Sequence, residues 1–377
     1  MSLALPAQDA YYQHFYGNEA EFNPAMTAQR GAMRLGFSMR TQWGADNAQQ
    51  YTTRKLTFEE SLPCFFLDYG LFARRDEEGQ GKLTTSEFGG RIAAAFPLSK
   101  KGASNVFNLR VGLGLAFGQR SVDFSKLTFL DQLDPLYGLV DADGNPNPTG
   151  FQAPLGSGAS PRYSTPSLGV SLKGGLNRRG VRPITFDVGV AVHNLGGLVS
   201  PDSRQTSSLL GLDNALGERW VFNALADAVV ARKNRRYWSV RPAVVYQTQE
   251  GLSYVEVGTG LSWNRTINVG AYHHLSHDVS GAADNLSWTS LQLEIGGRLG
   301  ESSTRMDLAF SYAFQQGYLK NYVRPPLEVT ATFSFGKSTT CLLMGYDDIA
   351  DMSRKNATSC FNFTTARNRL YDSIWYQ

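Results

Sequence analysis

Residues 327–335 read Leu-Glu-Val-Thr-Ala-Thr-Phe-Ser-Phe, a stretch in which apolar and polar side chains alternate without a break. Because successive side chains of a strand point to opposite faces of the sheet, this segment has one apolar face and one polar face. The same alternation returns in residues 109–118, 184–193 and 305–314. Many such segments of roughly ten residues, separated by turn residues, are the sequence signature of an all-β, antiparallel transmembrane β-barrel.

The overall composition is compatible with this interpretation. The chain has 377 residues, and it contains no apolar run near the roughly 18 residues that a membrane-spanning helix needs. Its mean hydropathy is −0.28, as expected when apolar residues occupy only every second position of a strand. A net charge of +3 is too small to argue for a nucleic-acid partner, and we expect none.

Turn signals divide the chain into about fourteen strands, an even number as in bacterial barrels. We expect these strands near residues 29–43, 51–60, 63–75, 84–97, 105–120, 164–177, 183–194, 217–232, 237–247, 251–264, 267–278, 286–298, 302–314 and 326–337. The barrel would then span residues 29–337. Residues 1–28 would hold a signal remnant and a periplasmic segment, and residues 338–377 a periplasmic tail.

The lengths of the connections predict the orientation. The long connections, 121–163, 195–216 and 315–325, all fall at the same end of the expected barrel. Short turns of bacterial barrels lie in the periplasm and long loops lie outside. The sequence therefore predicts an outer-membrane protein with periplasmic termini, its long loops outside and lipid around its wall.

Two features of the termini add expectations. Residues 1–7 look like the end of a secretory signal, for which we expect cleavage after Ala7. In the tail, an oxidising periplasm would allow Cys341 and Cys360 to pair, which would stabilise it by about 3 kcal/mol. Cys64 is then left as a buried or lumenal thiol, and no cysteine spacing resembles a zinc site.

The expected lumen mixes charges of both signs with glycine. Balanced signs argue against an ion-selective pore and favour cross-strand pairs that brace the wall. The charged positions expected to face inward are Arg34, Arg40, Asp68, Arg91, Arg110, Lys173, Asp187, Asp227, Arg241, Glu256, Glu294, Arg305, Asp307 and Glu328. The glycines are Gly112, Gly114, Gly118, Gly189, Gly258, Gly260 and Gly270.

So many inward glycines leave room for something inside the barrel. Water, the loop 121–163 and an aromatic N-terminal stretch are the candidates. We expect the stretch, which contains Tyr11, Tyr12, Phe15, Tyr16 and Phe22, to pack into the periplasmic mouth.

Aromatic side chains are expected at both membrane interfaces, where amphipathic rings lie at the headgroup level. Those expected at the outer end are Trp43, Tyr51, Trp220, Tyr246 and Trp288, and those at the inner end Tyr237, Trp238, Trp263 and Phe335.

The residues for catalysis or metal binding do not converge. His273 and His277 share one strand face but would lie roughly 13 Å apart, too far to share a metal. We interpret them and His274 as solvated. Residues 141–145, Asp-Ala-Asp-Gly-Asn, lack the remaining acidic ligands of a calcium loop. His193 has no identifiable nucleophile. We therefore expect no metal, no cofactor and no enzymatic activity.

Three stretches resemble one known family. They are Phe22-Asn-Pro-Ala25, Leu127-Thr-Phe-Leu-Asp-Gln-Leu-Asp-Pro135 and Val190-Ala-Val-His-Asn-Leu195. Over about residues 10–337 the chain resembles the PorP/SprF outer-membrane proteins of the type IX secretion and gliding machinery of Bacteroidota. The second stretch is the most specific, although Leu130 replaces that family's usual glycine. The tail departs from shorter members.

This resemblance implies a non-enzymatic barrel that helps to export and anchor a large surface adhesin. Its loops 121–163 and 195–216 would hold the adhesin's C-terminal domain. The periplasmic turns and tail would contact the translocon motor or a peptidoglycan-linked scaffold. The candidate contact residues are Leu127, Phe129, Asp131, Gln132, Asp134 and Pro135.

Three alternatives remain open. The nine-residue stretch 127–135 could instead fold inward and brace the barrel. The whole protein could be a passive or substrate-selective channel, which the glycine-lined wall favours. An outer-membrane hydrolase is a distant third.

Overall fold

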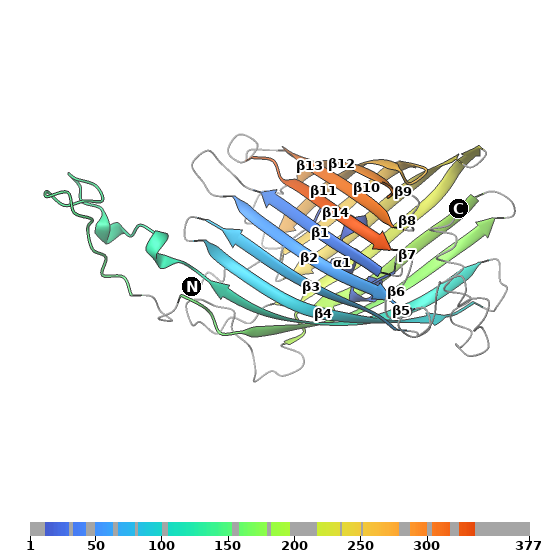
Figure 1. The fold of residues 1–377 in the computed structure, drawn as a ribbon, viewed down its shortest axis with the longest axis horizontal. Coiled ribbons are helices and arrows are strands. Elements are labelled where there is room, and N and C mark those ends of the chain that lie inside the picture. Colours follow the sequence, from blue (N-terminus) through green and yellow to red (C-terminus); the bar gives the residue numbers. More distant parts are fainter. Residues whose placement is uncertain are drawn as a thin grey trace.

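Fourteen antiparallel strands close into one barrel, in which each strand pairs with its neighbours in sequence and β1 pairs with β14 (Figure 1). The computed structural model describes residues 12–29, 33–42, 50–62, 67–79, 82–99, 105–152, 158–178, 182–196, 217–233, 236–249, 252–278, 287–299, 304–316 and 324–335. The strands are β1 (Met33–Gln42), β2 (Tyr51–Ser61), β3 (Leu67–Glu78), β4 (Leu83–Pro97), β5 (Val106–Ser121), β6 (Tyr163–Arg178), β7 (Arg182–His193), β8 (Arg219–Lys233), β9 (Arg236–Gln249), β10 (Leu252–Trp263), β11 (Ile267–Asp278), β12 (Ser287–Arg298), β13 (Arg305–Gln316) and β14 (Leu327–Phe335).

The helical elements are short. They are η1 (Phe15–Gly17), α1 (Glu19–Phe22), η2 (Pro24–Met26), η3 (Phe124–Lys126) and η4 (Leu130–Gln132). No helix in the described part of the chain is long and apolar enough to cross a membrane.

The predicted barrel is confirmed, and each expected strand overlaps an observed one. The first and third strands differ most in their starts, since β1 begins at Met33 and not near residue 29, and β3 begins at Leu67 and not near residue 63. Residue 29 belongs instead to a buried turn of residues 27–29. We call the end where β5 and β6 connect the loop end, and the end where β1 begins the turn end (Figure 1).

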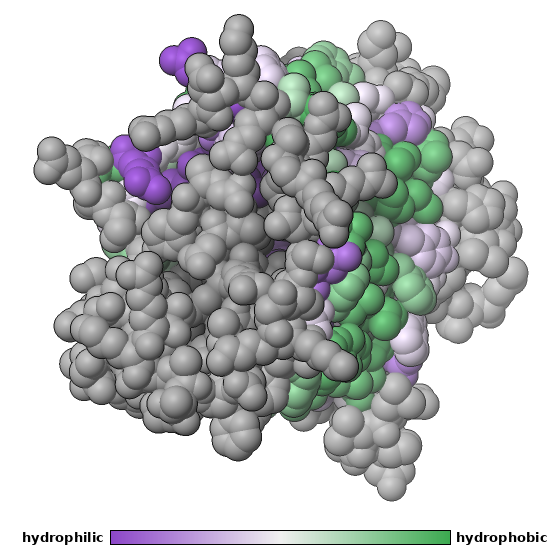
Figure 2. Space-filling view, turned by 90° about the vertical axis from the view of Figure 1, so that its right-hand side faces the viewer, coloured by the Kyte–Doolittle hydropathy of each residue, from purple (hydrophilic) through white to green (hydrophobic). Residues whose placement is uncertain are grey.

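The two faces of the wall differ as the alternation predicts. On β12, Leu291, Leu293 and Ile295 are exposed on the outside, while the alternate residues Ser290 and Gln292 are buried. Hydrophobic residues line the part of the outer wall that is visible in Figure 2. Lipid is the environment that makes such exposure favourable, because it removes the apolar surface from water.

The charged side chains predicted to face the lumen do so. Several form the expected cross-strand pairs, such as Arg110 Nη2 with Asp68 Oδ2 at 2.9 Å and Arg241 Nη1 with Glu294 Oε2 at 2.9 Å. The buried members are Arg40, Asp68, Arg91, Arg110, Lys173, Asp187, Arg241, Glu256 and Glu328.

An N-terminal segment, residues 12–29, fills the middle of the lumen, and we call it the plug. Its rings form an apolar core: Phe15 lies 5.3 Å from Phe22 and 5.4 Å from Tyr272 of β11, measured between ring centroids. The Tyr16 hydroxyl donates to Ala226 O at 3.1 Å. The lumen therefore has its own small hydrophobic core inside a polar wall.

Inward glycines make room for the plug. At Gly112 of β5, an added Cβ would collide with the backbone of Pro24 and Ala25. At Gly169 and Gly189, it would collide with the side chain of Asn23. The wall is thus hollowed where the plug approaches it. Beside other inward glycines the space is taken by side chains of the barrel strands. Tyr163 packs against Gly118, and Tyr272 packs against Gly258 and Gly270.

The plug lies deeper than the periplasmic mouth that we predicted. Gln13 N donates to Glu328, one residue from the loop-end limit of β14. Gln29 O accepts from Lys173 Nζ, nearer the turn end of β6. The segment therefore crosses the lumen from the loop end toward the turn end. The glycines that it contacts, Gly112, Gly169 and Gly189, lie in the middle of their strands. Tyr11 lies outside the described residues.

One histidine prediction and part of the aromatic prediction were wrong. His274 is not solvated but 3% exposed, and it stacks on Trp288 with ring centroids 3.6 Å apart. Both belong to inward positions of β11 and β12, so Trp288 faces the lumen and not the membrane interface. Trp220 and Trp238 are exposed on the outer wall, as expected, whereas Trp43 and the side chain of His277 lie outside the described residues.

Replacing Gly112 with Val tests the packing of the plug. The added side chain cannot fit against η2, so we expect the plug to loosen and the barrel to lose about 2 kcal/mol of stability. Single-channel recording should show a larger conductance than that of the wild type, and thermal unfolding should shift downward. Gly297→Val is the matched control, because nothing lies within 4 Å of a Cβ at Gly297. An unchanged Gly112→Val barrel would contradict this packing.

Candidate functional site

The stretch Phe22–Ala25 fastens the plug to the wall. The Asn23 amide donates to the carbonyl oxygens of Val170 at 3.1 Å and Val190 at 3.3 Å, on the neighbouring strands β6 and β7. Its Oδ1 accepts from Ala25 N at 2.9 Å, which caps η2. One buried asparagine thus joins two strands to the plug.

The first and third stretches singled out from the sequence meet here. His193 Nε2 lies 3.1 Å from Phe22 O, and Val190 supplies one of the carbonyls that bind Asn23. His193 is therefore a satisfied polar residue in a structural contact, as expected. The two stretches are more than 160 residues apart in the chain, and their contact is a feature of the barrel interior.

Charged groups hold the rest of the plug. Glu21 of α1 pairs with Arg91 at 2.7 Å and with Lys55 at 3.5 Å. Glu328 of β14 accepts from Gln13 N at 2.6 Å and from Asn18 Nδ2 at 3.0 Å. Buried charges are tolerated where they are paired in this way, and removing one partner leaves the other uncompensated. The plug is fixed by specific contacts on several sides of the lumen.

The loop between β5 and β6 extends away from the barrel, and we call residues 122–158 the arm (Figure 1). Its two ends lie together: Val122 N donates to Gly158 O at 2.8 Å, and Ser121 and Ala159 form a bridge. The base of the arm therefore continues the β5–β6 hairpin. Residues 153–157 lie outside the described part.

Polar side chains of stretch 127–135 shape the arm from within. Asp131 Oδ2 accepts from Thr149 Oγ1 at 3.0 Å and from Gly150 N at 2.6 Å. Gln132 Nε2 donates to Asn147 O at 3.1 Å, and Gln132 O accepts from the Asn147 amide at 2.9 Å. These bonds tie the outgoing half of the arm to the returning half.

Asp134 and Pro135 build a tight turn. Asp134 Oδ1 accepts from Leu136 N at 2.7 Å and from Tyr137 N at 2.9 Å. These two N–H donors, Tyr137 first, hold the pKa of the exposed Asp134 carboxyl below its usual range. Gly138 closes the turn with a φ of 77°, a conformation that favours glycine.

Aromatic stacking stiffens the base of the arm. The Phe129 ring stacks on Phe151 with centroids 4.2 Å apart and planes 16° apart, and Phe124 approaches Phe151 at 5.1 Å. Leu127 follows the η3 turn, two residues before Phe129 in the sequence, and is half-buried. The arm is therefore a small self-supporting structure.

We call residues 130–150, the part of the arm beyond the Phe129–Phe151 stack, the tip, and it exposes large apolar side chains. Leu130 is 85% exposed, Leu136 78% and Tyr137 50%, and Leu133 and Leu139 are about half exposed. None of the described arm residues 122–152 is buried. The alternative in which stretch 127–135 folds into the lumen is wrong, because the side chains of Asp131, Gln132 and Asp134 bond to other residues of the arm and the plug occupies the lumen.

The fragment 141–145 is a turn. Asp141 Oδ1 accepts from Asn145 N at 2.8 Å and from Asp143 N at 2.9 Å, so backbone amides occupy the carboxylate. Among the described residues, no group of three or more His, Cys, Asp or Glu is arranged to hold a metal.

Sequence reasoning found one half of the arm and missed the other. Asn147, Thr149 and Phe151, which complete its contacts, lie in a stretch rich in Asn, Pro and Gly that reads only as a loop. The predicted Cys341–Cys360 pair, the tail and most of loop 195–216 lie outside the described residues.

Fold and lumen together define a plugged outer-membrane β-barrel. A family model for the type IX secretion system membrane protein PorP/SprF matches residues 4–333, and the chain belongs to this family. It is thus a membrane component of the type IX secretion system, located in the outer membrane.

Among solved structures, the chain is similar to the CymD monoaromatic hydrocarbon channel, with 11% identity, a TM-score of 0.41 and coverage of 84% of this chain and 92% of that one. It is also similar to the toluene transporter TodX of Pseudomonas putida, with 10% identity, a TM-score of 0.38 and coverage of 84% and 93%. CdiB from Acinetobacter baumannii has 6% identity, a TM-score of 0.39 and coverage of 80% and 59%. None of the curated proteins matches the chain.

Replacing Asp131 with Ala removes the acceptor that joins the two halves of the arm. We expect faster amide hydrogen exchange at Gly150 and its neighbours, with unchanged thermal stability of the barrel, because the arm's bonds are its own. Asp143→Ala, an exposed carboxylate on the same arm, is the control. A destabilised barrel in Asp131→Ala would contradict an independent arm.

The turn at Asp134 should weaken in acid. Because the folded pKa is lowered, its stabilising effect is present above the unfolded pKa and is lost as the pH falls through the folded pKa. Hydrogen exchange at Leu136 and Tyr137, corrected for intrinsic rates, should therefore accelerate only at acidic pH. In Asp134→Asn this pH dependence should disappear, and its persistence would assign it to another group.

Proposed function

We propose that this barrel is a non-enzymatic anchor that helps to export a large surface adhesin and retains its C-terminal domain outside the cell. The observation that carries the proposal is the arm, a self-supporting projection with Leu130, Leu136 and Tyr137 exposed at its tip. Large apolar side chains on a stiff support are typical anchors of a protein interface. The polar residues that we first assigned to partner contact would instead hold this surface in shape.

The direction of binding follows from the expected orientation. The loop end would face outward, as long loops do in bacterial barrels, so the arm would meet a partner after it has crossed the membrane. The turn end would then face translocon components or a scaffold in the periplasm. Membership of a type IX secretion family supports both partners.

The plug favours an anchor over a passive channel. It crosses the lumen and is fastened by Asn23, Glu21 and the aromatic core. The cavity beside it, lined by Glu21, Arg74 and Arg91 among others, measures about 40 Å³, room for one or two water molecules. Silence of the wild-type barrel in single-channel recording supports the anchor, and a large stable conductance would favour the channel.

Removing the apolar tip should release the adhesin. In Leu130→Ser/Leu136→Ser, we expect the barrel to fold normally and the adhesin to shift from the cell surface to the medium, with affinity lowered at least about tenfold. Surface labelling followed by quantitative mass spectrometry measures the ratio. Ala142→Ser, an exposed apolar position elsewhere on the arm, is the matched control.

A deletion gives a second, independent measurement. Because Val122 and Gly158 are hydrogen-bonded, residues 123–157 can be replaced by a short glycine turn without disturbing β5 and β6. This variant should also lose the adhesin. Normal surface retention in both variants would refute the arm as the binding site.

A further inference from the structure

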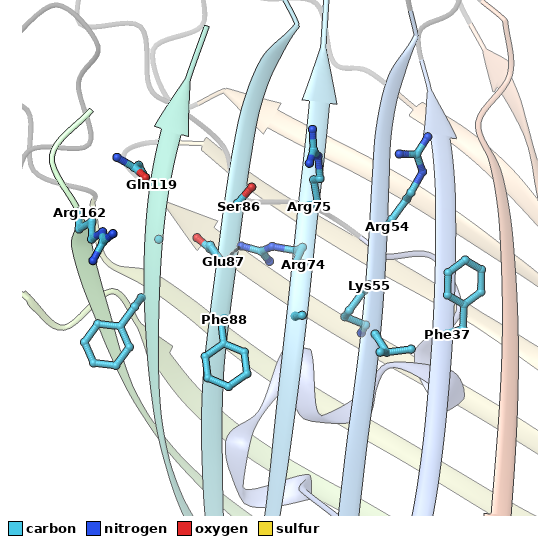
Figure 3. A pocket seen from close by; sticks show the side chains of 14 residues that line it. Phe37, Arg54, Lys55, Arg74, Arg75, Ser86, Glu87, Phe88, Gln119 and Arg162 are labelled. Carbon is cyan, nitrogen blue, oxygen red and sulfur yellow. Dashed lines mark hydrogen bonds and ion pairs between the residues drawn. The ribbon is translucent and has the colours of Figure 1, made fainter. Parts of the chain in front are cut away.

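A row of polar side chains crosses the outer face of four neighbouring strands, β2 to β5, near the loop end. Arg54 of β2 pairs in register with Arg75 of β3, which pairs with Ser86 of β4, which pairs with Gln119 of β5. Arg162 continues the row just before β6. Figure 3 shows these side chains side by side across the strands.

An apolar row lies two residues further from the loop end on the same strands. Its members Leu56, Ala73, Phe88 and Phe117 are also paired in register, and Phe37 of β1 extends it. Leu56, Phe88 and Phe117 are 59%, 58% and 56% exposed, so they face lipid. The two rows together line an open groove of about 740 Å³ on the outer wall.

The polar row carries an excess of positive charge. Arg54 and Arg75 lie directly opposite each other, an arrangement that is unfavourable unless an anion compensates it. Glu77 accepts from Arg75 at 2.9 Å and lies 3.6 Å from Arg54, so a single carboxylate serves both. Arg162 makes no ion pair with any residue that the structure describes.

We infer that this groove binds a phosphorylated glycolipid of the surrounding leaflet, of the lipid A type. Its phosphates would lie on Arg54, Arg75 and Arg162, and its acyl chains would follow the apolar row. Guanidinium groups pair with phosphate through two parallel hydrogen bonds, and neutral Ser86 and Gln119 add further polar partners. The arginines lie where the apolar wall ends, which is the depth of the headgroups. The loop end is taken to face outward.

Lipid binding to the detergent-purified full chain tests the inference, with diphosphoryl lipid A as the probe and native mass spectrometry as the measurement. We expect wild type to bind it and Arg54→Gln/Arg75→Gln/Arg162→Gln to bind roughly tenfold more weakly. Arg75→Gln and Arg162→Gln are also made singly, so the test does not depend on the triple variant folding. Arg236→Gln, an exposed arginine at the turn end, is the matched control and should bind like wild type.

Two further arms separate the lipid from other ligands. Dephosphorylated lipid A should bind wild type as weakly as diphosphoryl lipid A binds the triple variant, and millimolar inorganic phosphate should not displace the bound lipid. Equal binding of both lipids by wild type, equal binding of diphosphoryl lipid A by wild type and the arginine variants, or displacement by free phosphate would overturn the inference. None of these outcomes bears on the proposed binding of the adhesin by the arm, since the groove lies on the outer wall of the barrel.

Discussion

A bilayer offers no hydrogen-bond partner to a polypeptide, so every backbone group within it needs a partner in the chain. Closure of β1 on β14 satisfies this constraint, because it leaves no edge strand. The same constraint fixes which face of each strand is apolar. Lipid takes the outer side chains, and the polar and charged residues are forced into the lumen.

A lumen lined with charge is itself unstable unless its groups find partners. Here the plug supplies these partners. Glu21 forms ion pairs with Arg91 and Lys55, and the backbone N–H of Gln13 donates to Glu328. Placing the plug immediately before β1 keeps it close to its site, since only a short connection separates residue 29 from Met33. Among the described residues, the lumen is therefore filled by a segment of the same chain.

Much of this could be predicted from the sequence, for a physical reason. The alternation of β14 or β12 is local and appears in the sequence directly, so strand number and the inward charged positions were predicted correctly. Inward glycines at 112 and 189 predicted an occupied lumen. Which residue occupies the space beside each glycine was not predictable, because a residue such as Asn23 hydrogen-bonds to partners 147 and 167 positions away in the chain. The prediction for His274 was wrong for the opposite reason. Strand alternation places His274 on the inward face of β11, but we predicted it to be solvated because it lies near a loop.

The arm shows the limit of local patterns most clearly, since Asp131 and Gly150 lie 19 residues apart in a segment without periodicity. Yet the barrel explains why the arm can be rigid. Strands β5 and β6 carry the plug contacts at Gly112 and Gly169 and end at the bridge between Ser121 and Ala159. One continuous hairpin therefore runs from the filled lumen to the base of the arm. A force on a partner held at the tip would pass through paired backbone into the closed wall, where the hydrogen bonds of every strand share it.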